Sequence, residues 1–221
     1  LNKKIIILLS VLFLVVSCGT EVKENNETKN ITAEENEVVE EMFEESEEEK
    51  VEVLEWGLSE AEKEGLILMR EEEKLARDTY AYFYEKYGQK IFGNIGSSEE
   101  KHQSAVLPLL DKFNLQDPIK DDTAWVFTMP MLDQLYKDLV AAWDISMVEA
   151  LKVGMTIEDL DIKDLDELLE GTNDADIIRV YENLLKGSYN HLKAFKKNLD
   201  KQGWEYTPQF ISQEEYDRIL A

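Results

Sequence analysis

The chain has 221 residues, of which 24 are lysine or arginine and 48 are aspartate or glutamate, so its formal net charge is −24. Such an acidic surface repels phosphate backbones, and we therefore expect no nucleic-acid partner. The single cysteine, Cys18, excludes an internal disulfide and any zinc or redox site that needs several thiolates.

The first 17 residues have the pattern of an export signal. Two lysines precede an apolar run over residues 5–16, which is shorter than the roughly 20 residues of a membrane-spanning helix. Residues 15–18 resemble the bacterial lipobox, whose cysteine is acylated and becomes the first residue of the mature chain. We expect a signal peptide over residues 1–17, a Cys18 anchored in membrane lipid, and an extracytoplasmic location in the cell envelope, at the outer membrane or cell surface. An uncleaved signal anchor is the alternative.

Residues 18–57 form an acidic segment. Fifteen glutamates and only three lysines occur in residues 19–55. Because apolar side chains are few, this segment cannot bury enough surface to offset its ordering entropy. We expect a disordered tether that is extended by its own charges, with weak cation binding as the alternative.

The folded domain is predicted to begin at residue 58. Ser59 and Glu62 match a capping box, no proline follows before Tyr87, and Gly88 is a stop signal, which together predict a long first helix. Its inward face is expected to carry residues spaced three or four apart, namely Leu66, Met69, Glu73, Ala76, Tyr80 and Phe83.

A second helix is predicted from Ser97 or Ser98 to about Phe113, after a turn over residues 93–96 and with a kink at Pro108. Residues 114–130 contain turn signals and should form a loop. A shorter helix follows over residues 131–143.

The last part of the chain predicts two further long helices. One spans residue 147 to about Ile162, with a short turn or helix up to Gly171, and the other runs from residues 172–174 to Gly203. A small helix follows Ser212. We therefore predict an all-α fold in which residues 58–211 form a four-helix bundle with one long crossover connection, and residues 212–221 an extra helix.

Polar side chains interrupt the apolar face of each long helix. Residues three apart on a helix point in similar directions, as in the pairs Glu99/His102 and Glu158/Asp161. The apolar residues Ala105, Val106 and Leu109 are expected to continue the first pair's face into the core. Buried carboxylates are unfavourable unless they are paired or bind a metal. The candidate metal ligands are Glu73, Glu99, His102, Glu158, Asp161 and His191.

Oxygen and imidazole ligands suit iron or manganese, with zinc as a further candidate. Glu72 lies one position from Glu73 and could take its place. The competing interpretation is a buried polar network in which Arg70 or Arg77 neutralises the acids and the histidines only donate hydrogen bonds.

Several separated motifs also resemble one known family. Residues 69–78, Asn94–Ile95 with Glu99-x-x-His102, residues 150–154 and residues 187–192 are together similar to the ferritin-like domain of unknown function 2202 family, over roughly residues 58–211. The resemblance implies a ferritin-like four-helix bundle. More distantly, the chain resembles rubrerythrin-type di-iron proteins, which carry ligands at positions that match the six candidates.

One position departs from the rubrerythrin pattern. The fourth helix of those proteins carries Glu-x-x-His, where this chain has Ser188 and His191. One metal ion, or two with an open coordination position, is therefore consistent with the sequence. The first functional hypothesis is an iron- or manganese-dependent oxidase or peroxidase at the cell envelope. The second is a non-catalytic interaction module with a structural metal or none. The sequence indicates no particular protein partner, electron donor or oligomeric state.

Overall fold

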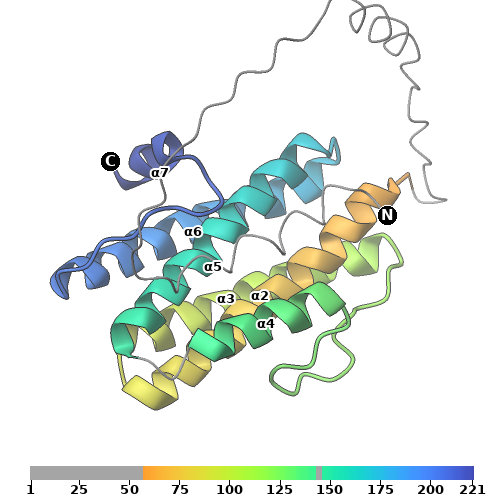
Figure 1. Cartoon of the computed structure of the whole chain (residues 1–221). Helices are drawn as coiled ribbons and strands as arrows, with labels where there is room; N and C mark the ends of the chain where they lie inside the picture. Colours follow the sequence, from red (N-terminus) through yellow and green to blue (C-terminus); the bar gives the residue numbers. More distant parts are fainter. Residues whose placement is uncertain (1–56, 143–145) are drawn as a thin grey trace, which may run out of the picture. The chain divides into compact units, whose positions relative to one another are not determined.

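The computed structural model describes residues 57–142 and 146–221, and its regular elements within these ranges are helices (Figure 1). The predicted signal peptide, Cys18 and the tether up to residue 56 lie outside the described residues. None of the described helices combines the length and the apolar composition that crossing a bilayer requires. The helices are α2 (Glu60–Tyr87), α3 (Lys90–Lys112), α4 (Pro130–Ala142), α5 (Met147–Glu170), α6 (Ala175–Lys201) and α7 (Gln213–Leu220).

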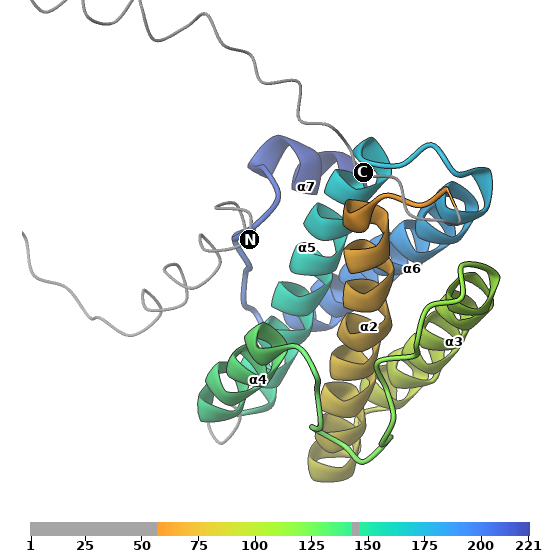
Figure 2. The same ribbon diagram turned by 90° about the vertical axis from the view of Figure 1, so that its right-hand side faces the viewer.

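Four long helices form the bundle. α2 packs against α3 and α5 against α6, while contacts between α2 and α5 and between α3 and α6 close the arrangement. The connections within each pair are short, so the two helices of a pair run antiparallel. α4 belongs to the long connection between α3 and α5, and it contacts both α2 and α5 (Figure 2). The predicted all-α bundle, with a long crossover and short extra helices, is confirmed.

Polar side chains cap α2, α5, α6 and α7 at predicted sites, whereas Ser97 and Ser98, which we expected to cap the second helix, lie inside α3. The Ser59 hydroxyl accepts the Glu62 N–H at 3.2 Å, and the Ser59 N–H donates to the Glu62 carboxylate at 2.8 Å, which completes the capping box. Gly88 ends α2 in a left-handed conformation with φ of 64°. Side chains that accept N–H groups also cap three later helices, and these are Ser146, Asp174 and Ser212.

The start of α3 differs from the prediction. We expected a turn over residues 93–96, whereas α3 begins at Lys90 and continues through that stretch. Gly93 lies against α2, where a Cβ atom would come within 3.1 Å of the Tyr84 ring. Close helix packing therefore offsets the low helix propensity that made these glycines look like a turn.

The end of α5 also differs from the prediction. We expected the helix to end near Ile162, but α5 is continuous to Glu170 and is followed by Gly171. Leu165 is fully buried, so the inward face continues beyond residue 162. The acidic residues of this stretch are accommodated within one helix because its apolar side is packed.

Charged side chains of α2 hold the crossover. The Glu71 carboxylate accepts the backbone N–H groups of Thr128 and Met129 at 2.6 and 2.9 Å. The Lys74 ammonium donates to the Thr123 carbonyl oxygen at 2.9 Å. Glu71 and Lys74 are both fully buried, so these contacts replace the water that each charge has lost.

The core consists of two apolar clusters separated by a layer of polar side chains. On α2, Met69 belongs to one cluster and Ala76 to the other, with Glu72 and Glu73 between them. α3 and α6 show the same order, and on α5 Glu158 and Asp161 lie between Ile157 of one cluster and Leu165 of the other. The polar layer consists of Glu72, Glu73, Glu99, His102, Glu158, Asp161, Ser188 and His191.

Candidate metal centre

The candidate ligands all lie in the polar layer, and the inward faces are as predicted with one exception. Val106 and Leu109 are buried below the Glu99/His102 pair, but Ala105 is exposed. The Glu99 side chain is 2% exposed and the His102 side chain 16% exposed. The sequence pattern therefore predicted the inward face of α3 correctly, except that Ala105 points to solvent beside the buried Val106.

Glu99 lies at the middle of the site. One of its oxygens, Oε2, is 2.8 Å from Nδ1 of His102, and the same nitrogen is 3.4 Å from Oε2 of Glu73. A carboxylate from α2 and a carboxylate from α3 therefore face the same nitrogen of His102.

The second oxygen of Glu99 faces the other half of the bundle. Its Oε1 is 2.8 Å from Nδ1 of His191, which is 3.4 Å from Oε2 of Glu158. The rings of His102 and His191 stack with their centroids 5.3 Å apart. We call Glu73, Glu99, His102, Glu158 and His191 the central cluster.

The facing atoms of the central cluster are close but poorly aligned for hydrogen bonds. Five of these atoms are buried without a hydrogen-bond partner: Nδ1 of His102, Nδ1 of His191, Oε2 of Glu73, Oε1 of Glu99 and Oε2 of Glu158. Buried polar atoms are normally satisfied, and each such group left unpaired costs about 1–3 kcal/mol. Donor atoms that converge without bonding to one another are the pattern expected around a cation.

The carboxylates and imidazoles shift each other's protonation. Burial lowers the pKa of His102, but Glu73 and Glu99 outweigh this effect and raise the pKa to about 10. Burial likewise lowers the pKa of His191, which Glu158 and Glu99 raise to about 11. Burial raises the pKa of Glu73 to about 8 against the lowering effect of His102. The cluster therefore favours positive charge, supplied either by protons or by a metal ion that displaces them.

The arginines that could have neutralised these acids bind elsewhere. Arg70 forms an ion pair with Asp117 at 3.0 Å, and Arg77 pairs with both Asp78 and Asp122 at 2.8 Å. The alternative of an arginine-neutralised buried network is therefore wrong. The acids of the central cluster have only the two histidines as ion-pair partners among the described residues.

Two residues that support the site were missed by the sequence reasoning. Tyr80, which we placed only on the inward face of the first helix, donates its hydroxyl to Glu158 Oε1 at 2.6 Å. Gly187 lies under the His102 ring, where a Cβ atom would come within 2.6 Å of Nε2. A glycine inside a helix costs about 1 kcal/mol relative to alanine, and this was the available signal that position 187 has a packing role.

Three further residues of the polar layer do not pair with the histidines of the central cluster, and these are Asp161, Glu72 and Ser188. Within the described residues, Asp161 forms no hydrogen bond or ion pair with either histidine, and its pKa is raised well above its usual value by burial and by nearby carboxylates that include Glu158 and Glu72. The Ser188 hydroxyl donates to the Leu184 carbonyl oxygen of its own helix at 3.3 Å. Ser188 therefore brings no carboxylate to the position where the rubrerythrin pattern has one.

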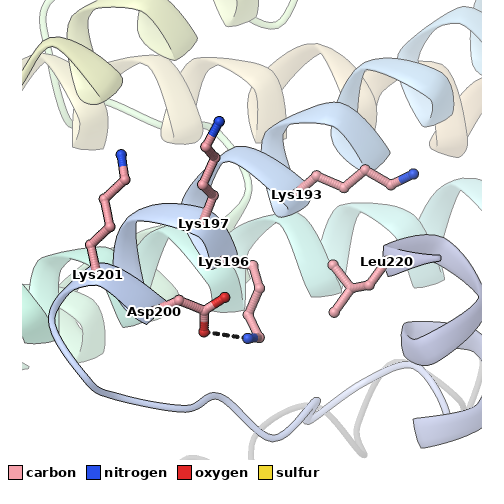
Figure 3. A pocket seen from close by; sticks show the side chains of 6 residues that line it. All are labelled: Lys193, Lys196, Lys197, Asp200, Lys201 and Leu220. Atoms are coloured by element: carbon pink, nitrogen blue, oxygen red, sulfur yellow. Dashed lines mark hydrogen bonds and ion pairs between the residues drawn. The ribbon is translucent and has the colours of Figure 1, made fainter.

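A surface pocket of about 420 Å³ lies apart from this site, between the end of α6 and α7 (Figure 3). Its lysine side chains would repel a cation, so it is not a second metal centre. The pocket is lined by Lys193, Lys196, Lys197, Asp200, Lys201 and Leu220.

Three residues of the central cluster meet the geometric requirement for a shared metal ion. Glu99, His102 and His191 each offer one ligand atom, and these atoms all lie within 4.8 Å of one another. The group is at least nine-tenths buried at Glu99 and His191 and comes from two different helices. A buried Glu/His/His group that could hold a metal ion is thus present, in agreement with part of the predicted ligand set.

Comparisons with known proteins agree with the family resemblance. Residues 62–221 match the family described as uncharacterized protein domain DUF2202. The chain is 55% identical to the uncharacterized protein MJ0754 of Methanocaldococcus jannaschii over 164 residues, which are 74% of this chain and 89% of that protein. It also matches the crystal structure of that hypothetical protein with a TM-score of 0.73 over 74% of this chain and 93% of the other. The chain therefore belongs to the DUF2202 family.

Proposed function

We propose that the central cluster binds two divalent cations, iron or manganese, and that the protein is a metal-dependent oxidoreductase of ferritin-like type. One observation carries the proposal: the two oxygens of Glu99 face two different histidine nitrogens, each at 2.8 Å. A carboxylate arranged in this way can bridge two ions. Glu73 and His102 would complete one half of the site, and Glu158 and His191 the other.

Charge balance supports two ions and leaves room for a further anion. Glu73, Glu99 and Glu158 bring three negative charges, whereas two divalent cations bring four positive charges and the neutral imidazoles none. The buried Asp161 lies close to Glu158 and Glu99, and its carboxylate is available for the remaining charge. In this proposal, Asp161 is a sixth ligand.

Iron or manganese held by carboxylates and imidazoles supplies redox chemistry with dioxygen or peroxide. The contribution of the chain is to position the donor atoms and to exclude water. Tyr80 holds Glu158 through its 2.6 Å hydrogen bond. The apolar clusters on either side of the polar layer keep the site dry and its electrostatic interactions strong.

A non-catalytic metal-binding module is the second candidate function. It is favoured by Ser188, which replaces a carboxylate of the rubrerythrin pattern and bonds to its own helix. The lone cysteine also rules out a thiolate-bound electron-transfer centre within this chain. A structural metal would use the same residues but would not react with an oxidant.

The test measures bound metal and turnover on the purified chain. Iron or manganese should be present at up to two ions per chain and should be lost in Glu99→Gln and His102→Ala, while Glu100→Gln, which changes an exposed neighbour, should retain it. Peroxide consumption or oxygen uptake by the loaded parent supports the oxidoreductase. Metal without turnover supports the structural module, and a metal-free parent that cannot be loaded contradicts both.

We also propose that acylated Cys18 anchors the protein in a membrane of the cell envelope. The supporting observation is the basic, apolar and lipobox pattern of residues 1–18. Mass spectrometry of the mature amino terminus in the native host should find a diacylglyceryl group on Cys18. A Cys18→Ala variant that is processed and located like the parent would contradict this proposal.

A further inference from the structure

A row of lysines lies on the exposed face of α6. Residues 186–201 contain five lysines and one aspartate, in a chain whose formal net charge is −24. Four of these lysines are exposed and follow each other at intervals of seven, four and four residues. On a helix these intervals keep the side chains within about 80° of one another, over a length of roughly 22 Å. We call Lys186, Lys193, Lys197 and Lys201 the basic stripe.

The fold leaves the basic stripe without counter-charges. Within the described residues, the only α6 lysine in an ion pair is Lys196, which pairs with Asp200. Figure 3 shows the three other lysines drawn there extending away from this pair. Exposed lysines on other helices do have partners, as Lys63 does in Glu60. A protein with 48 acids and 24 bases therefore keeps four positive charges on one helix face unneutralised.

The basic stripe does not help α6 to form. Lys193, Lys197 and Lys201 are four residues apart, and like charges at this spacing repel each other. α4 uses the same spacing for an attractive pair, between Asp133 and Lys137. Only Lys201 lies in the last turn of α6, where a positive charge favours the helix dipole. The stripe thus opposes local stability and lies outside the core, which indicates a role towards an external anion.

Apolar side chains lie beside the stripe at the end of α6. The pocket of about 420 Å³ between α6 and α7 is lined by Leu220 as well as by three lysines of the stripe (Figure 3). Trp204 follows the end of α6 and is 51% exposed, and the Lys152 ammonium lies 4.6 Å from the centre of its ring. Exposed tryptophan beside lysine is typical of surfaces that contact the headgroup region of a membrane.

We propose that the basic stripe docks the folded domain on the anionic headgroups of a membrane. Clusters of roughly four to eight lysines or arginines are typical of surfaces that bind anionic lipid. A straight row on an exposed helix face can contact several headgroups of one plane at the same time. The acids elsewhere on the domain do not cancel this attraction, because salt screens charges that are more than roughly 8 Å apart.

The choice of a membrane over an acidic protein rests on the acyl anchor proposed at Cys18. Such an anchor would keep the domain close to lipid, so headgroups are the anions that it meets at the highest effective concentration. One acyl signal and one basic patch together also give firmer attachment than either alone. The affinity of the stripe for anionic lipid does not itself require the anchor.

The experiment measures the binding of residues 51–221 to lipid vesicles. These residues form a compact unit by themselves and contain neither Cys18 nor the apolar run over residues 5–16. Vesicles of phosphatidylcholine are compared with vesicles that contain about one-third phosphatidylglycerol, by flotation at low and at high salt. Lys197→Gln combined with Lys201→Gln is the stripe variant. The matched control combines Lys120→Gln and Lys137→Gln, which remove two exposed charges from the crossover.

The parent should bind the anionic vesicles at least about tenfold more tightly than the neutral ones and should be released by high salt. The stripe variant should bind the anionic vesicles about 25-fold more weakly, because each lysine near such a surface contributes about fivefold, and the control should bind as the parent does. The stripe variant should also unfold at the parent temperature or above, since a repulsive pair is removed.

Parent-like binding by the stripe variant, or equal binding of the parent to both kinds of vesicle, overturns the inference. Binding of the parent to poly-glutamate without binding to anionic vesicles also overturns it and assigns the stripe to an acidic protein partner. A failure of the proposed anchor is read separately, by mass spectrometry of the mature amino terminus, because the vesicle test uses protein without Cys18.

A second measurement locates the surface that contacts lipid. Residues 51–221 contain no cysteine, so Asn190→Cys gives one attachment point within the stripe for an environment-sensitive dye. Its emission should shift to shorter wavelength on anionic vesicles, whereas the same dye at Lys120→Cys in the crossover should not shift. An unchanged emission at position 190, or equal shifts at both positions, contradicts docking through α6.

Discussion

A methyl group at position 187 should damage the metal centre while leaving the fold largely intact. In Gly187→Ala the new Cβ atom would lie 2.6 Å from Nε2 of His102, which falls 0.8 Å short of an ordinary contact at 3.4 Å. The Cε1 atom of the same ring is closer still. The imidazole must therefore move by about 0.8 Å or more, unless α3 and α6 separate.

This displacement should lower metal affinity strongly while reducing the stability of the helical bundle only slightly. Metal–ligand distances tolerate deviations of about 0.2 Å, and disturbing the support of a ligand typically lowers affinity about 10- to 100-fold. Overpacking costs about 1–3 kcal/mol in stability, and alanine in place of a helical glycine returns about 1 kcal/mol. We expect a net loss of no more than about 2 kcal/mol, with metal affinity reduced at least tenfold.

The assay compares Co²⁺ or Mn²⁺ titrations with thermal unfolding of the metal-free proteins. Gly96→Ala is the matched control, because a Cβ atom there would make only an ordinary contact at 3.5 Å. It should keep parent affinity and gain up to about 1 kcal/mol in stability. Parent-like affinity in Gly187→Ala, with the protein folded, would refute the assignment of His102 as a ligand held against α6.

Three further perturbations test the energetics of the site and its surroundings. The metal-free protein should lose stability as the pH rises from about 7 to 11, because folded His102 and His191 keep their protons up to pKa values of about 10 and about 11 whereas the unfolded chain releases them near 6.5. Melting curves should show a shallower loss when both are changed to glutamine, and an equal slope would contradict the raised pKa values. Tyr80→Phe removes the hydrogen bond to Glu158 and should cost about 1–3 kcal/mol and weaken metal binding about tenfold; unchanged metal titrations would contradict its positioning role. Asp159→Asn should cost about 3 kcal/mol and expose the segment before α7 to proteolysis, without changing metal binding; an unaltered digestion pattern would contradict this capping role.

The helices and their caps were largely predictable because they depend on local interactions. Ser59 and Glu62 are three residues apart, and their reciprocal hydrogen bonds need nothing outside the first turn of α2. The two boundary errors, at the start of α3 and at the end of α5, both arise where distant packing outweighs local preference. Gly93 is helical because Tyr84 of α2 packs on it, and no spacing rule within α3 could reveal that.

The predicted ligand set shows the same difference between local interactions, which the sequence reveals, and contacts between helices, which it does not. Periodicity placed Glu73, Glu99, His102 and His191 on inward faces, because a helical face follows from 3.6 residues per turn. It could not show that the two oxygens of Glu99 face two different histidines. Nor could it separate acids that the fold satisfies, such as Glu71, from its neighbour Glu72.

For this protein, the sequence alone determined the all-α class, the helix caps, the family and the polar interruption of each inward face. The tertiary structure decided which donor atoms meet, which arginines bind elsewhere, and why positions 80 and 187 matter to the site. The physical reason is that some of these properties depend on interactions within one helix and others on contacts between helices. The direction of a side chain around its helix is a local property, whereas the distance between atoms on different helices depends on how the whole bundle packs.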